Sequence, residues 1–307
     1  MLTTEQRRGL SRVIAVATGK GGVGKTSITA NVAGLLAAAE MRVLAVDLDS
    51  QSNLGEDLGY TATGRGDHGE AAFQAITTGA ALTPIRDVRA NLDVIPAGEY
   101  TEDLAGVLDA RRGRRGEEAV MESLAVSLAP IAGDYDVVLL DCPPKGRVIQ
   151  EIALAAARWL LIPTKSDVSS RKAISHIADR FTAARTVNPE VDLLGVVLFG
   201  SGTSTTRLRQ DTLREIAADL QAEDPLFHAV IRHAEVSAVQ ARNSGRLVHE
   251  LEEVARTQEP WYTRLRTRTT DQPVVASSVT GLAGDYQQLA EEIVARLEKH
   301  ETGETDR

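Results

Sequence analysis

Short apolar runs alternate with stretches of helical spacing along most of this 307-residue chain. Runs of four or five apolar residues without alternating polar positions are typical of strands that are covered on both faces. We therefore predict an α/β fold, with a doubly wound, mostly parallel sheet and helices on both faces. The predicted strands lie at residues 13–17, 42–46, 92–95, 136–141, 159–162, where Pro163 closes the run, and 193–199. The first predicted helix begins at Thr26 and repeats apolar residues on one face, at Ile28, Val32, Leu35 and Leu36.

Between the first apolar run and this helix lies the sequence TGKGGVGKT, residues 18–26. Glycine lacks a Cβ atom, so a glycine-rich loop can turn several backbone N–H groups toward one anion at the N-terminus of the next helix. In a GxxxxGK[ST] loop the lysine reaches the β- and γ-phosphates and the hydroxyl ligates Mg²⁺, roles that fall to Lys25 and Thr26. A glycine-rich turn with a chance lysine is the alternative. The predicted nucleotide-binding residues are Gly19, Lys20, Gly21, Gly22, Val23, Gly24, Lys25, Thr26 and Ser27.

Acidic residues follow two of the predicted strands. Asp47 and Asp49 come directly after the run at 42–46, and Asp141 ends the run at 136–141. The carboxyl ends of parallel strands border the crevice in which α/β sheets bind ligands, and an extended chain puts Asp47 and Asp49 on one side. Asp141 can hold the water shell of Mg²⁺ as a Walker B aspartate does. For Asp47 and Asp49, a pair of solvated turn carboxylates is the alternative.

Three segments together resemble the ParA/MinD/nitrogenase-iron-protein group of deviant Walker A ATPases, which are P-loop NTPases. KGGVGKT resembles the phosphate loop of that group, in which a second lysine stands where Lys20 stands here. DLDSQ resembles its D-x-D-P-Q motif, with Ser50 in place of proline. DCPP, at residues 141–144, resembles the start of its segment that responds to the γ-phosphate.

This resemblance implies ATP and Mg²⁺ as cofactors and a homodimer in the ATP-bound state. Lys20 would cross to the nucleotide held by the other subunit, Asp47 would support the metal through water, and Asp49 would orient the attacking water. The catalytic residues that it implies are Lys20, Lys25 and Asp49. The metal residues that it implies are Thr26, Asp47 and Asp141.

The composition narrows the function classes. Cys142 is the only cysteine, which excludes disulfides within the chain and does not match the bridging cysteines of an iron–sulfur carrier. The chain has no run of about 18 apolar residues and no apolar signal-peptide region at its start, so we expect a cytoplasmic protein without a membrane partner. The family resemblance implies in addition that the protein is nucleoid-associated. The net charge of −9 means that any contact with DNA must come from a local basic patch.

Arginines in the second half of the chain are candidates for that patch. Residues 251–277 form an insertion that is atypical of the family, and its alternating arginines would share one face of an extended strand. A hairpin with a solvated arginine face is the alternative for this insertion. A further cluster of four arginines and two glycines at 111–116 is expected to break a helix over 101–128. The candidates for DNA binding are Arg207, Arg209, Arg242, Arg246, Arg264, Arg266 and Arg268.

The predicted organisation is one ATPase domain at residues 13–299, with tails at 1–12 and 300–307; the first tail could be a lone helical turn. The family resemblance implies an ATPase that is slow alone and stimulated by a partner. It would dimerise on ATP, bind DNA non-specifically and act in DNA segregation with a ParB-like centromere-binding protein. The alternative is a MinD-like or orphan ParA-like ATPase that positions a protein cargo or acts at the membrane.

Overall fold

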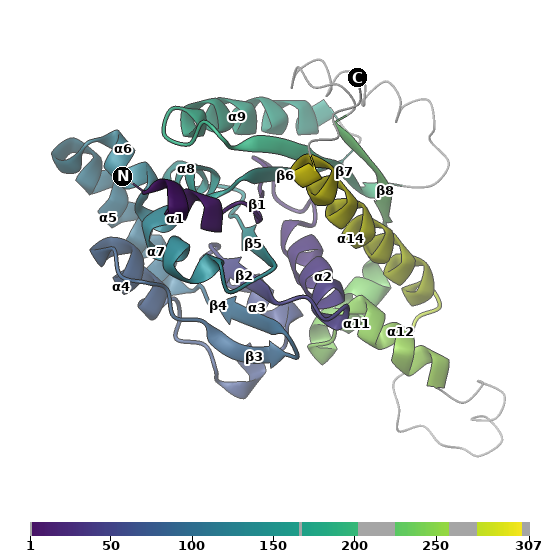
Figure 1. Ribbon diagram of the computed structural model, residues 1–307. Coiled ribbons are helices and arrows are strands. Elements are labelled where there is room, and N and C mark those ends of the chain that lie inside the picture. The colour runs from purple at the N-terminus through teal and green to yellow at the C-terminus, as the bar shows by residue number, and fades with distance from the viewer. Residues whose placement is uncertain (1, 166–167, 202–224, 258–274, 303–307) are drawn as a thin grey trace, which may run out of the picture.

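The computed structural model describes residues 2–165, 168–201, 225–257 and 275–302. These residues form one sheet with helices on both of its faces, which confirms the predicted α/β fold (Figure 1). The strands are β1 (Val13–Val16), β2 (Val43–Asp47), β3 (Ile85–Arg89), β4 (Leu92–Ile95), β5 (Val137–Asp141), β6 (Trp159–Thr164), β7 (Asp192–Ser201) and β8 (Leu226–Arg232).

The helices surround this sheet. The first half of the chain contributes α1 (Thr4–Gly9), α2 (Lys25–Ala38), α3 (Asn53–Asp57), the 3-10 helix η1 (Thr61–Thr63), α4 (Glu70–Thr78), α5 (Glu99–Arg115), α6 (Glu117–Met121) and α7 (Ser123–Ala132). The second half contributes α8 (Arg147–Ala156), α9 (Val168–Arg185), α11 (Glu235–Ser244), α12 (Val248–Thr257) and α14 (Val279–Thr302). None of the described helices is long and apolar enough to span a membrane.

The strand order is β3-β4-β2-β5-β1-β6-β7-β8, and all neighbouring pairs are parallel except β3 and β4. The chain winds from β1 toward β2 on one side of β1, and it crosses from β5 to β6 on the other side. The order of the sheet therefore reverses at β1, and such a reversal opens a ligand crevice at the carboxyl ends of the strands.

Each face of the sheet carries its own apolar core. On β1, Val13 and Ala15 pack into one core, whereas Ile14 and Val16 pack into the other. The first core lies under α4 to α9, and the second lies under α2, α12 and α14 (Figure 1). Burial of a strand on both sides explains why its sequence is continuously apolar.

Two details of the sheet differ from the prediction. The antiparallel edge strand β3 has no counterpart in it, because β3 is half-exposed, polar and interrupted by Asp87 at φ 52°. Pro163 does not close β6, since the strand runs on to Thr164 and Pro163 pairs with Val197 of β7.

The helix break predicted within residues 111–116 is confirmed only at the last of them, because α5 continues through Arg115 and the helix is interrupted at Gly116, whose φ is 85°, before α6 begins at Glu117. Two of the arginines in this stretch have partners of their own. Arg111 donates to the carbonyl of Thr77 at 2.6 Å, and Arg112 pairs with Asp109, Glu117 and Glu151.

The first predicted tail contains a short helix, in agreement with the alternative of a lone helical turn, and the second predicted tail is shorter than expected. Residues 4–9 form helix α1, and Arg7 fixes it by donating to Glu122 and to the carbonyls of Ala155 and Val187 at 2.9–3.1 Å. At the other end α14 continues to Thr302. Within the proposed insertion, residues 251–257 belong to α12 and residues 258–274 lie outside the described part of the chain.

Candidate functional site

The phosphate loop connects the end of β1, the central strand, to the N-terminus of α2. Gly22 and Gly24 have φ angles of 70° and 80°, values that favour glycine. Gly24 has a second reason to be glycine, because a Cβ atom there would clash with the ring of Phe199 in β7. The loop therefore holds its backbone against the helix terminus, as an anion site requires.

The predicted carboxylates converge beside this loop. Asp47 ends β2 and Asp141 ends β5, and the two residues are directly paired in the register of these parallel strands. Val16, the last residue of β1, pairs with Asp141 on the other side. Asp47 and Asp141 are only 2% and 1% exposed, so the sheet buries two acidic groups next to each other at its carboxyl edge.

Burial dominates the electrostatics of this edge. It raises the pKa of Asp141 to about 7, although the Thr26 side chain and the Lys25 ammonium group act in the opposite direction. It also raises the pKa of Asp47 well above its usual range, with Asp141 adding to the effect. The pKa of Lys25 is lowered by burial, and its Nζ donates to the carbonyl of Lys20 at 3.3 Å. These groups lack the countercharge that would stabilise both carboxylates in their ionised form.

The same atoms fit a bound cation. Both side-chain oxygens of Asp141 and Oδ2 of Asp47 are buried without a hydrogen-bond partner among the described residues. The described residues form no group of three or more His, Cys, Asp or Glu side chains that could hold a metal by themselves. An ion that keeps several waters and is completed by substrate phosphates suits such a site, and Mg²⁺ has this preference.

Asp49 lies at the mouth of the site, more exposed than Asp47. Its backbone N–H donates to Oδ1 of Asp47 at 3.0 Å, and its own Oδ1 accepts from the N–H of Gln51 at 3.1 Å. These two bonds connect the turn after β2 to the buried carboxylate, so Asp49 keeps a defined position relative to Asp47.

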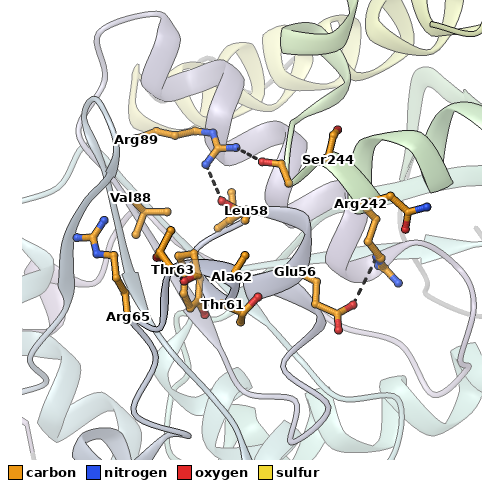
Figure 2. Close-up of a pocket in the computed structure, with 14 residues that line it drawn as sticks. Glu56, Leu58, Thr61, Ala62, Thr63, Arg65, Val88, Arg89, Arg242 and Ser244 are labelled. Carbon is orange, nitrogen blue, oxygen red and sulfur yellow. Dashed lines mark hydrogen bonds and ion pairs between the residues drawn. The ribbon is translucent and has the colours of Figure 1, made fainter. Parts of the chain in front are cut away.

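The structure describes two of the predicted DNA-binding arginines, and one of them is already engaged. Nε of Arg242 in α11 donates to Asp57 of α3 at 2.6 Å, and Glu56 lies 4.0 Å away (Figure 2). Asp57 also faces the hydroxyl of Ser27 at 3.4 Å, so this ion pair joins α11 to the start of α2. Arg246 lines a hollow of about 240 Å³ on the same side. The other candidates, Arg207, Arg209, Arg264, Arg266 and Arg268, lie outside the described residues.

Replacement of Arg242 by methionine is expected to lower the free energy of unfolding by about 1–2 kcal/mol, because it leaves Asp57 buried beside Ser27 without its cation. Urea denaturation followed by circular dichroism measures this change. Arg246→Met is the matched control and should change the stability by less than about 0.5 kcal/mol. Equal stability of the two variants would contradict this role of Arg242.

The contacts of Arg89, which connect distant parts of the chain near the site, could not be predicted from the sequence. Arg89 of β3 donates to the carbonyls of Leu58 and Gly245 at 2.7 and 2.9 Å and pairs with Glu250 of α12. Figure 2 shows this guanidinium between the two chain segments, above a cavity of about 570 Å³. Arg89 therefore holds the segment after the Asp49 turn against α11 and α12.

The fold and the phosphate loop define a P-loop NTPase. A family model described as an AAA domain matches residues 11–193 of the chain. The chromosome partitioning protein ParA of Caulobacter vibrioides is 32% identical over 255 residues, which cover 78% of this chain and 88% of the relative. The chain belongs to the AAA-domain family and, within it, to the ParA-type ATPases.

Solved structures agree with this fold. A Cyanothece McdA variant in complex with ATP has a TM-score of 0.68 at 18% identity, and the match covers 92% of this chain and 96% of that one. Cobyrinic acid a,c-diamide synthase from Mycobacterium smegmatis, with a bound ATP analogue and magnesium, has a TM-score of 0.58 at 25% identity. That match covers 86% of this chain and 99% of the synthase.

Proposed function

We propose that this protein is a ParA-type ATPase that dimerises on ATP, binds DNA non-specifically and acts in DNA segregation with a ParB-like centromere-binding partner. The observation that carries the proposal is the pair of buried carboxylates, Asp47 and Asp141, at the carboxyl edge of the sheet beside Lys25 and the phosphate loop. Relatives named as chromosome partitioning proteins support the biological role.

The chain's own residues divide the work at this site. Backbone N–H groups of residues 19–27 and the N-terminus of α2 bind the phosphates, and the Lys25 ammonium group neutralises the β- and γ-phosphates. Thr26, Asp47 and Asp141 would hold Mg²⁺, which neutralises developing charge on the phosphoryl group when it is bound. Asp49 orients the attacking water from the mouth of the site.

Lys20 gives this site its dependence on a second subunit. Lys25 already supplies a cation for the phosphates bound by its own chain, so a second lysine in the loop is not required there. We assign the Lys20 side chain to the nucleotide of the partner in an ATP-bound homodimer. A site that lacks one cationic group hydrolyses slowly, which lets dimerisation and a stimulating partner control the rate.

A membrane-acting role of the MinD-like kind is the second candidate, and α14 argues against it. Leu289, Ile293 and Leu297 of this last helix are buried against the sheet instead of forming a free apolar face. The last turn is also fixed, since Arg12 pairs with Glu301 at 2.6 Å and His300 packs on the ring of Trp159. Flotation with anionic vesicles, run beside a DNA-shift assay, distinguishes the two candidates.

DNA binding is expected to require ATP and to weaken steeply with salt. A dimer doubles the number of basic side chains on one surface, and neutralising about six phosphates lowers affinity by roughly 10³-fold between 50 and 200 mM salt. The triple change Arg264→Ala, Arg266→Ala and Arg268→Ala should reduce the slope of log K against log salt by about five, at about 0.9 per phosphate.

The DNA-shift assay is run at several salt concentrations with ATP, with ADP and without nucleotide. Arg242→Met is the control, because the Arg242 guanidinium is already held by Asp57. An unchanged slope in the triple variant would remove the insertion from the DNA surface and direct attention to Arg207, Arg209 and Arg246. Binding that does not depend on ATP would contradict the proposed coupling.

A further inference from the structure

Gln150 is a fully buried polar residue in α8 that no predicted motif includes. Its Nε2 donates to the carbonyl of Thr18 at 3.3 Å and also to the carbonyl of Pro143. Thr18 begins the phosphate loop, and Pro143 lies in the segment 142–146 that follows Asp141. A single side-chain amide therefore joins the two stretches of chain that border the phosphate site.

The same two stretches also come close at a second point. A Cβ atom placed on Gly21 would lie 3.9 Å from Cβ of Pro144, so the proline lies beside the phosphate loop. The segment then leads into α8 at Gly146, and the carbonyl of Gly146 accepts a hydrogen bond from the backbone N–H of Gln150 at 3.2 Å. Gln150 thus fixes the segment 142–146 from its helical end, while Asp141 holds its other end in β5.

Arg180 of α9 determines how the Gln150 amide is oriented. Its guanidinium donates to Oε1 of Gln150. An arginine has only donors, so it must face the oxygen of the amide, and the NH₂ group is then directed to the two carbonyls. Burial lowers the pKa of Arg180 from its usual value, but an arginine keeps its charge at neutral pH.

Glu151, the next residue in α8, has a separate task. It is 1% exposed and pairs with Arg147 at 2.6 Å and with Arg112 of α5. These ion pairs fasten α8 to α5, whereas the contacts of Gln150 lead to the phosphate loop and α9. The contacts of Gln150 are therefore not needed to account for the attachment of α8 to the domain.

We propose that Gln150 is a positioning residue for ATP hydrolysis, which holds the phosphate loop and the segment 142–146 in fixed positions relative to each other. Arg180 sets the orientation of the Gln150 amide. This inference rests on the proposed ATPase function. Without the amide donors, the carbonyls of Thr18 and Pro143 lose these buried hydrogen bonds. The phosphate loop can then shift relative to Asp141. The phosphate-binding N–H groups and Lys25 are untouched, so turnover should suffer more than ATP binding.

The experiment compares steady-state hydrolysis and ATP affinity among four variants. Gln150→Glu keeps the shape and the acceptor for Arg180 but removes both donors, so kcat should fall about tenfold while the Kd for ATP changes less than about threefold. Arg180→Met should lower kcat in the same way, and Arg180→Lys, which restores a donor, should keep most of it. Arg185→Met is the matched control on α9, because Arg185 donates to the Val191 carbonyl and Asp192 and not to α8.

The outcomes separate this inference from the proposed function. If Gln150→Glu and Arg180→Met have the same kcat as the wild type, the positioning role is overturned, even if both variants melt at a lower temperature. If Gln150→Glu does not fold, the contrast between Arg180→Met and Arg180→Lys decides the question, since Gln150 is then intact. A complete absence of ATP turnover in the unaltered protein would overturn the proposed function and this inference together.

Discussion

ATP binding is expected to fall at least about 100-fold when Lys25 is replaced by alanine. The ammonium group is buried beside the loop, and a charge-assisted contact to phosphate contributes about 1.5–3 kcal/mol per hydrogen bond. Its removal also leaves Asp141 without the nearby cation that lowers its pKa. Isothermal titration calorimetry with ATP and Mg²⁺ measures the loss directly.

Lys20→Ala is the matched comparison, because it removes a second lysine from the same loop. Its carbonyl contact to Lys25 is a backbone feature that alanine retains. We expect the monomer to bind ATP within about threefold of the wild type but to lose ATP-dependent dimerisation. Equal loss of ATP affinity in the Lys20 and Lys25 variants would contradict the assignment of Lys20 to the partner's nucleotide.

Asp49→Ala is expected to bind ATP and to accumulate as a dimer while its turnover falls about 10²-fold or more. The reason is that the phosphate loop, Asp47 and Asp141 stay in place, whereas the group that orients the attacking water is gone. Single-turnover kinetics, with ATP affinity measured in parallel, provides the test. A variant that no longer binds ATP would show that Asp49 acts in binding rather than in hydrolysis.

The sequence alone predicts two parts of the site: the phosphate loop, which is one continuous segment, and the aspartates at the carboxyl ends of strands. Residues 18–26 carry their own geometry, because a strand, four glycines and a helix start follow one another directly. Asp47 and Asp141 could be placed at one edge because continuous apolar runs predict parallel strands, whose carboxyl ends lie at the same edge of a sheet. The structure brings them into direct register on β2 and β5.

Contacts that join distant parts of the chain could not be predicted in this way. Arg242 and Asp57 are 185 residues apart in sequence, and Gln150 and Thr18 are 132 apart. An isolated arginine or glutamine carries no periodicity that would identify its partner. For the same reason the sequence does not reveal that Arg111 of α5 donates to the Thr77 carbonyl or that Arg112 pairs with Glu151 of α8.

The edge strand β3 shows a different limit. Its residues are half-exposed, so the pattern of burial that identifies a central strand is absent. Its position depends instead on the turn at Asn91, with φ 61°, and on Asp93, which accepts from the N–H of Asp87 at 2.8 Å. Such a strand is specified by its partner β4 rather than by its own sequence.

Sedimentation velocity of the Asp49→Ala variant tests the central claim most directly. The monomer has a mass of 32.9 kDa. Because hydrolysis is expected to be about 10²-fold slower or more in this variant, the ATP-bound state should persist during the run. We predict a particle of twice the monomer mass with ATP and Mg²⁺, and a monomer with ADP and Mg²⁺ or when Lys20→Ala is added. A monomer under every nucleotide condition, with ATP binding confirmed by calorimetry, would contradict the account of a dimerising ParA-type ATPase.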